Sequence, residues 1–244
     1  MNIIADLHTH NGEICGHATG SLDEMLIYAS KLGMEAFAST DHGPFMEGTP
    51  LSYYMNNLKR PKNIYGMRFL SGIEADIRDY DGTIEIQTAD LLKLDWVIAS
   101  IHGMNYTYGS LEENTNAYLS VLENPAVDCL GHIGRGNFPV DFEKVIRKIK
   151  EKGRTAEVNN HTFDFSDTDI NRCRDIAFLC VKHELPIVIT SDAHSTEAAG
   201  HFSNSIEFLK SISFPEQLII NADKDRLFSF LEKRKNEKTE FVKD

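Results

Sequence analysis

The chain opens with an acid and three histidines within twelve residues. The stretch "DLHTH" supplies Asp6, His8 and His10, and "GHATG" adds His17 seven residues after His10. Imidazole nitrogens and carboxylate oxygens are ligands for transition-type divalent ions. Because the apolar run "IIA" comes directly before them, these residues raise the hypothesis of a metal site at the end of a buried strand.

The same pattern follows six further apolar runs. The residues after these runs are Asp41 and His42, Glu74 and Asp76, His102, His132, Asn159 with Asn160 and His161, and Asp192 with His194. In parallel α/β folds the carboxyl ends of the strands carry the active site. One histidine there is commonly structural, but the joint pattern predicts a metal site.

Some polar residues fall outside this pattern. His183 lies within a helical pattern and His201 follows "AAG", so we expect surface or packing roles for both. The stretch "DYDG" is a turn signal, so Asp76, Asp79 and Asp81 are expected to be solvated turn residues.

Seven apolar, β-branched-rich runs must position the candidate ligands. Their continuous apolar character favours buried parallel strands, at residues 2–7, 36–40, 68–73, 96–101, 127–132, 155–158 and 186–191. Helical patterns lie between them, at residues 21–32, 110–123, 141–153 and 169–184. Ser21 and Glu24 form a predicted capping box, and Gly33 ends that helix. This alternation predicts a parallel α/β sheet, either open or closed into a barrel.

The length allows one large domain or two small ones, and a chain this long buries enough surface for one core. We expect a single domain over residues 1–244, with a frayed tail at 235–244. The net charge of −12 argues against an extended nucleic-acid surface. No apolar run approaches the ~18 residues of a membrane span, and no secretory leader is visible, so we expect a cytoplasmic protein without membrane partners. The scattered cysteines are expected to be reduced thiols: Cys15, Cys129, Cys173 and Cys180.

Six motifs carry a more specific resemblance. In chain order, "DLHTH", "TDHG", "GIEADI", "IHG", "GHIG" and "SDAH" resemble those of the PHP (polymerase and histidinol phosphatase) family, between residues 6 and 194. The likeness is greatest to the small stand-alone YcdX-type phosphatases. The resemblance implies an α/β fold, a distorted (β/α)7 barrel, with a trinuclear metal site at the C-terminal ends of the strands.

The resemblance also implies how the ligands are shared. One ion would be held by His8, His10, Glu74 and Asp192, and Glu74 would bridge to a second ion held with His102 and His132. The third ion would be held by His17, His42 and His194. The spacing from His10 to His17 is one residue longer than the family pattern.

Such a ligand set points to hydrolysis. Mainly imidazole ligands favour zinc, with manganese or iron(II) as alternatives, over magnesium. A metal-bridging hydroxide would attack phosphorus, because metals lower the pKa of bound water to about 7. We therefore expect a phosphoesterase, and specifically a phosphomonoesterase that acts on a small phosphorylated metabolite. Arg135 and Asn160 are predicted substrate contacts, and Asp6 and Asp41 are predicted to orient ligands, with His42 a candidate for Asp6.

Two other functions compete with this one. The first is a non-catalytic metal-binding accessory domain, although structural sites are normally closed and cysteine-rich. The second is an amidohydrolase-like metal hydrolase, against which no lysine follows a predicted strand. Substrate choice would come from the loops at 45–63 and 104–114, and the sequence leaves the substrate and the oligomeric state open.

Overall fold

The computed structural model describes residues 1–46 and 57–243. Its strands are β1 (Ala5–Asp6), β2 (Ala36–Ser39), β3 (Asn63–Ile64), β4 (Met67–Asp76), β5 (Trp96–Ser100), β6 (Cys129–Leu130), β7 (Thr155–Asn159) and β8 (Ile187–Thr190). Its α-helices are α1 (Leu22–Lys31), α3 (Thr88–Leu91), α4 (Leu111–Val121), α5 (Phe142–Glu151), α6 (Asp167–Lys182), α7 (Ser203–Ser211) and α8 (Lys224–Phe241). Short 3₁₀ turns η1 (Asn160–Asp164), η2 (Glu216–Leu218) and η3 (Ile220–Ala222) complete the elements.

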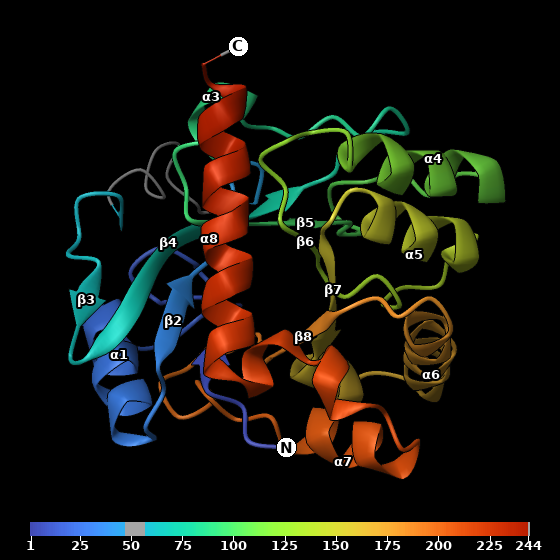
Figure 1. Ribbon diagram of the computed structural model, residues 1–244. Helices are drawn as coiled ribbons and strands as arrows, with labels where there is room; N and C mark the ends of the chain where they lie inside the picture. The colour runs from blue at the N-terminus through green and yellow to red at the C-terminus, as the bar shows by residue number, and fades with distance from the viewer. Residues whose placement is uncertain (47–56, 244) are drawn as a thin grey trace.

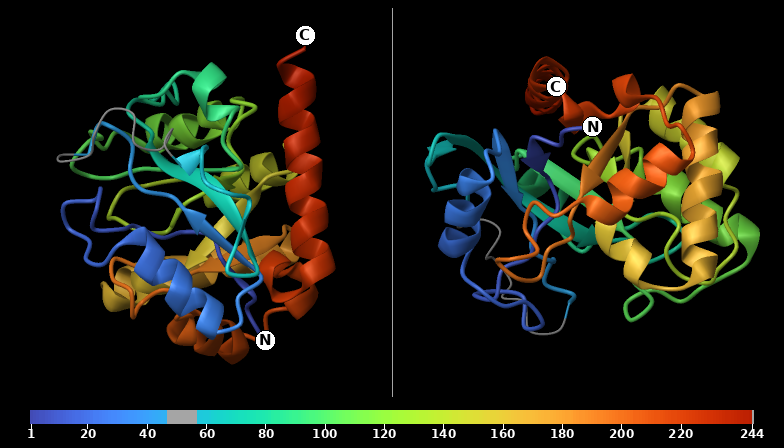
Figure 2. Two further views of the ribbon diagram at one scale, coloured as in Figure 1. Left: turned by 90° about the vertical axis from the view of Figure 1, so that its left-hand side faces the viewer. Right: turned by 90° about the horizontal axis from the view of Figure 1, so that it is seen from below.

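Seven parallel strands form a nearly closed barrel in the order β1-β2-β4-β5-β6-β7-β8. All seven predicted strands are present, and β3 adds a short antiparallel partner to β4. Helices stand between the strands and surround the sheet (Figures 1 and 2). The predicted distorted (β/α)7 barrel is therefore confirmed.

The seam between β1 and β8 closes in two different ways. On the side where the strands end, the Asp192 N–H donates to the His8 carbonyl (3.0 Å), and the His10 N–H donates to the Ala193 carbonyl (2.8 Å). On the side where they begin, the Asn221 side chain donates to the carbonyls of Ala5 (2.9 Å) and Ile189 (2.6 Å). The Asn221 side chain thus joins β1 to β8, which share no assigned backbone ladder.

Local sequence accounts for the helix boundaries. Helix α1 begins with the predicted capping box of Ser21 and Glu24, and Gly33, just beyond its end, has a φ of +79°. Helix α4 begins with an equivalent box made by Ser110 and Glu113. These caps satisfy backbone N–H groups that the first turn of a helix leaves free.

Helix α8 crosses the amino-terminal ends of the strands, on the side opposite the long loops after β1 and β2 (Figure 2). Its Leu227 and Leu231 join the core inside the barrel, which also contains Leu70, Trp96 and Ile98. The expectation of a frayed tail at 235–244 is wrong for the residues up to Phe241, since they continue α8 and Lys238 is buried. Among the described residues, no helix is long and apolar enough to cross a membrane.

Candidate metal centre

The first predicted ligand group comes together at the carboxyl ends of β1, β4 and β8. His8 Nε2 lies 3.3 Å from Glu74 Oε2 and 3.5 Å from Asp192 Oδ1. His10 Nε2 lies 3.5 Å and 3.2 Å from the same two oxygens. All four side chains are buried, so nitrogen and oxygen donors from three strands converge on one point.

Glu74 faces a second group with its other oxygen. Glu74 Oε1 is 2.9 Å from His132 Nε2 and 3.3 Å from His102 Nε2, whereas Oε2 faces His8 and His10. Nδ1 of His42 also lies 3.0 Å from Oε2. One carboxylate therefore presents each of its oxygens to a different group of histidines. This is the disposition that a bridging ligand requires.

The third group is more open. The ring of His10 is stacked between those of His42 (centroids 4.3 Å apart) and His194 (4.4 Å). His17 lies 4.8 Å from the His194 ring and is exposed. Cys15 also belongs to this cluster, since single donor atoms of four residues lie within 4.8 Å of one another: His10, Cys15, His42 and His194.

The backbone is strained where two of these residues follow their strands. His132 has a φ of +25° and Asp192 a φ of +56°, a backbone region that residues other than glycine rarely adopt. Such conformations persist only when surrounding contacts over-determine them. Here Glu157 Oε2 accepts the His132 N–H (2.6 Å), and the His8 carbonyl accepts the Asp192 N–H.

Two buried carboxylates orient the histidines from behind. Glu157 Oε1 accepts a hydrogen bond from His8 Nδ1 (2.6 Å), and Asp76 Oδ1 accepts one from His102 Nδ1 (2.5 Å). Such partners fix the tautomer of a ligating imidazole. Glu157 is absent from the predicted site, and the prediction of a solvated Asp76 is wrong because Asp76 is buried. Asp79 does serve a turn, accepting the N–H groups of Asp81 and Thr83.

The orienting roles predicted for Asp6 and Asp41 differ from their contacts. Asp6 accepts hydrogen bonds from Ser191 and Gly200 rather than from His42. Asp41 accepts two from Asn11, through the backbone N–H (2.8 Å) and the side-chain amide (2.6 Å). Both acids therefore brace the loops that carry ligands.

The buried carboxylates produce a negative potential that favours positive charge at the site. Burial alone lowers the pKa of His8, but the charges of Glu157, Glu74 and Asp192 raise it well above the usual value. His102 shows the same balance: Glu74 and Asp76 outweigh burial and raise its pKa to about 10. Either protons on the histidines or bound metal cations can balance this negative charge.

Four other histidines behave differently, because burial outweighs the attraction of the carboxylates near them. Burial lowers the pKa values of His10, His17, His132 and His194. Imidazole ligates metals only in its neutral form, so these four residues are in the state that ligation needs. Nδ1 of His10 and Nδ1 of His42 are buried without a hydrogen-bond partner among the described residues. The donor set therefore fits divalent ions.

A cavity of about 360 Å³ opens onto the cluster. Its wall includes Arg135, whose Nη2 donates to Asp192 (3.1 Å) and Asn159 (2.8 Å) and whose guanidinium lies 4.8 Å from the Phe165 ring. Asn160 lines a neighbouring cavity, and its Oδ1 accepts the Ser205 N–H (3.0 Å). The substrate contacts predicted for Arg135 and Asn160 stay predictions.

Three histidines outside the predicted ligand set have other partners. His183 pairs with Glu143 (2.8 Å) and His201 with Tyr28 (3.1 Å), so both lie outside the cluster as expected. His161 is 3.0 Å from Asp164 and lines the same cavity as Arg135. Residues 47–56 of the predicted specificity loop lie outside the described residues.

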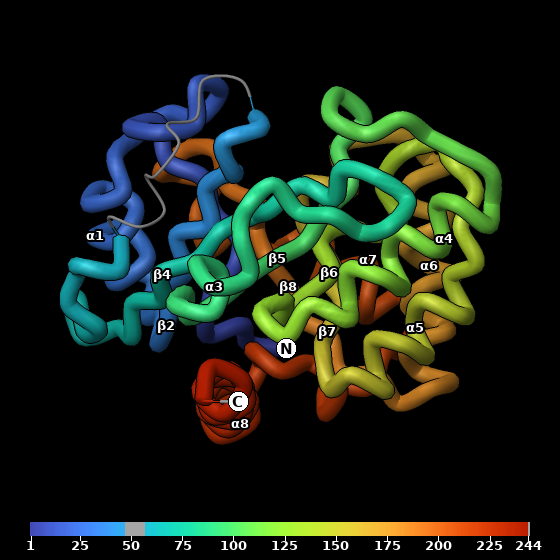
Figure 3. The backbone as a smooth tube through the Cα atoms, turned by 90° about the horizontal axis from the view of Figure 1, so that it is seen from above, coloured from blue at the N-terminus to red at the C-terminus, as the bar shows by residue number. Residues whose placement is uncertain are grey.

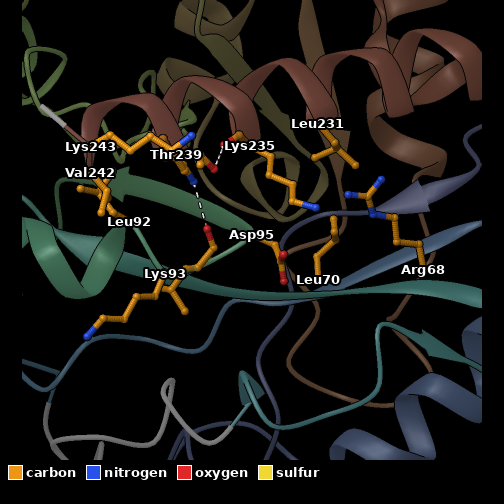
Figure 4. Close-up of a pocket in the computed structure, with 12 residues that line it drawn as sticks. Arg68, Leu70, Leu92, Lys93, Asp95, Leu231, Lys235, Thr239, Val242 and Lys243 are labelled. Carbon is orange, nitrogen blue, oxygen red and sulfur yellow. Dashed lines mark hydrogen bonds between the residues drawn. The ribbon is translucent and has the colours of Figure 1, made fainter.

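A second cavity, of about 350 Å³, lies between α8 and the beginnings of β4 and β5 (Figure 4). Its charged lining is mainly basic, and Asp95 is already bonded to Lys62 and Ser71. No histidine lines it. The cavity with the histidine cluster is therefore the candidate site.

Comparisons with known proteins agree with this geometry. The model of the PHP domain family matches residues 6–168, which is more than half of the chain. The chain belongs to the PHP domain family. The matched part of this PHP chain contains seven of the nine candidate ligands, and Asp192 and His194 follow it.

Relatives of this PHP chain cover nearly its whole length. A protein named "Probable phosphatase" from Clostridium botulinum is 40% identical over 235 residues, 96% of each chain. Another so named, from Acetivibrio thermocellus, is 38% identical over 236 residues, 96% of this chain and 98% of that one.

A solved structure shares the fold. It is the histidinol phosphate phosphatase of Lactococcus lactis, complexed with zinc, L-histidinol and phosphate. It superposes with a TM-score of 0.62 at 16% identity, over 88% of this chain and 95% of that chain.

Proposed function

We propose that this PHP protein is a metal-dependent phosphatase that hydrolyses monoesters of a small phosphorylated metabolite. The observation that carries the proposal is the position of Glu74, whose two oxygens face two different histidine groups. The names of the relatives and the zinc and phosphate of the Lactococcus structure support the same chemistry.

Three divalent ions, with zinc the first choice, suit the donors. His8, His10, Glu74 and Asp192 would hold one ion, and Glu74, His102 and His132 a second. His42 and His194 would hold the third, with His17 beside them. When bound, such ions supply a nucleophile at neutral pH by lowering the pKa of water, and they stabilise charge on a phosphoryl group.

The residues of the chain position both ions and substrate. Glu157 and Asp76 hold the rings of His8 and His102 so that each Nε2 faces Glu74. Arg135 is fixed by Asp192, Asn159 and Thr162 at the cavity wall. An immobilised guanidinium suits a phosphate oxygen, because guanidinium groups bind phosphate with charge-assisted hydrogen bonds. We infer a phosphate-binding role for Arg135 and a cytoplasmic location for the protein.

The test is a substrate panel with metal-reconstituted protein. The panel contains phosphate monoesters, histidinol phosphate among them, together with phosphate diesters, amides and lactones, each assayed with added zinc or manganese. We expect turnover of monoesters that a chelator abolishes. Turnover of amides or lactones in preference to every phosphate ester would overturn the proposal.

A further inference from the structure

Cys15 lies among the histidines of the third group although the predicted ligand set omits it. Its side chain is buried, with 1% of the residue exposed. Its Sγ lies 3.3 Å and 3.4 Å from the two ring nitrogens of His17. One donor atom each of Cys15, His10, His42 and His194 lie within 4.8 Å of one another, which is the spacing of ligands around one ion.

The loop fixes this position. The Asn11 carbonyl accepts the Cys15 N–H (2.9 Å), and the Cys15 carbonyl accepts the Ala18 N–H (3.0 Å). This turn places Cys15 inside and leaves His17 exposed. Cys15, rather than His17, is therefore the residue of this loop whose side chain is enclosed with the other donors.

Two neighbouring histidines give a second, independent indication of metal binding. His42 Nδ1 is 3.0 Å from Glu74 Oε2 but lacks hydrogen-bond geometry, and it has no other partner among the described residues. His10 is fully buried, and its Nδ1 is also without a partner there. Buried polar atoms are nearly always paired, so unpartnered nitrogens on two histidines that share a donor group with a buried thiol indicate a ligand.

The other cysteines lack such surroundings. Cys180 lies on α6 within the hydrophobic core between the barrel and its helices. Cys129 lies inside the barrel, where its Sγ is 3.5 Å from the Leu130 carbonyl. Neither of these two, nor Cys173 on α6, belongs to a group of possible metal ligands among the described residues.

We propose that Cys15 is a thiolate ligand of the third metal ion, which it shares with His42 and His194, with His17 on the exposed side. This inference rests on the metal centre of the proposed function. Ligation breaks the S–H bond, forms a metal–sulfur bond and releases the proton to solvent. The soft sulfur ligand makes this position select zinc over manganese more strongly than the two positions around Glu74, whose ligands are imidazoles and carboxylates.

Cobalt(II) reports on sulfur ligation without any assay of activity. A cobalt ion bound to a thiolate shows a sulfur-to-metal charge-transfer band in the near ultraviolet, which nitrogen and oxygen ligands do not give. We expect this band in the wild-type protein loaded with cobalt. Cys15→Ala should lose the band and bind one ion fewer per chain, whereas Cys180→Ala, which also removes a buried thiol, should keep both.

Elemental analysis separates the two proposals. If wild-type protein binds three cobalt ions and shows no band, the metal centre stands and Cys15 is not a ligand. If the protein binds no cobalt, both proposals are overturned. X-ray absorption of the zinc-loaded wild type adds a check that needs no variant, because a zinc–sulfur distance near ~2.3 Å differs from the ~2.0–2.1 Å of zinc–nitrogen; the absence of a sulfur shell contradicts the assignment.

Discussion

The two ends of the barrel both bury charged side chains, but they balance the charge differently. Where the strands begin, Asp128 accepts hydrogen bonds from Arg234 Nε (2.8 Å) and Lys238 Nζ (2.5 Å), and all three side chains are buried. Arg234 also donates to the carbonyls of Pro125 (2.7 Å) and Val127 (3.2 Å). The view along α8 shows this helix lying against that end (Figure 3).

Where the strands end, the carboxylates outnumber the permanent cations. Glu74, Asp76, Glu157 and Asp192 all face histidines, and Arg135 is the guanidinium that contacts Asp192. The chain supplies the counter-charge at one end and leaves a demand for cations at the other. Buried charge therefore indicates structure where the protein itself completes the pairing, and a ligand site where it does not.

The largest expected effect tests the unbalanced end. Glu74→Gln keeps the shape of the side chain but removes the charge that faces two histidine groups, so both adjoining ions should be lost. We expect phosphatase activity to fall about 10³-fold or more, since loss of metal catalysis costs several kcal/mol. Activity and metal content are measured together.

Glu143→Gln is the matched control for Glu74→Gln. Glu143 also pairs with a histidine, His183, but does so on the surface. The Glu143→Gln variant should retain the activity and the metal content of the wild type. Wild-type metal content in Glu74→Gln would remove Glu74 from the centre.

The second prediction tests the balanced end. Asp128→Asn removes the charge that pairs with the buried Lys238 and leaves Arg234 paired with Glu237 alone, so we expect the free energy of unfolding to fall by about 3–5 kcal/mol. The metal content of the folded protein should be unchanged. Chemical denaturation gives the free energy.

Asp90→Asn is the control for Asp128→Asn, because Asp90 pairs with Lys93 on the surface, and its loss should cost less than about 1 kcal/mol. Equal effects of the two substitutions would show that the buried network is not the stabilising element.

A third prediction concerns the carboxylates behind the ligands. Glu157→Gln should weaken metal affinity or activity about 10- to 100-fold, because Glu157 orients His8 and holds the His132 backbone. Metal titration by calorimetry checks the affinity, and Glu143→Gln again serves as control. Unchanged affinity and activity would show that Glu157 does not position the metal ligands.

The candidate metal ligands can be predicted from the sequence, whereas the carboxylates that hydrogen-bond to them are harder to identify. Histidines after apolar runs stand out, which is why the candidate ligands were predictable. Glu157 is hard to recognise because it lies inside the run 155–158, which reads as mainly apolar. The signal that could identify it is the alternation of Thr155, Glu157 and Asn159 with apolar residues, which places these three on one face of β7. The turn signal after Asp76 suggests a solvated residue, but its spacing of two from Glu74 places both on the same face of β4.

The tail of the chain could not have been placed from local sequence. Residues 235–240 are polar and charged, a composition typical of a frayed end. What orders them is the bond from Lys238 to Asp128, which lies 110 residues earlier in the chain. Only the three-dimensional structure brings that acid under α8.

The smallest expected effect concerns Glu85, which lies beside the unbalanced end. Its Oε1 accepts the Asp76 N–H (3.2 Å), and its Oε2 is buried without a partner among the described residues. Burial, followed by repulsion from Asp76, raises the pKa of Glu85 to about 7. Here a proton, rather than a metal ion, reduces the negative charge.

The raised pKa fixes the sign of a pH effect in the metal-free protein. Below the pKa of about 4.5 that an unfolded chain gives, both states hold the proton and nothing is gained or lost. Between that value and about 7 the unfolded state releases the proton first, so stability falls as pH rises. Glu85→Gln has no proton to lose there. Its unfolding free energy relative to wild type should therefore rise by about 1–2 kcal/mol between pH 4 and pH 8, less than the full shift implies because Glu85 is only partly buried. Denaturation of metal-free protein at both pH values measures this difference, with the exposed Glu112→Gln as control, and parallel stability curves for wild type and Glu85→Gln would contradict it.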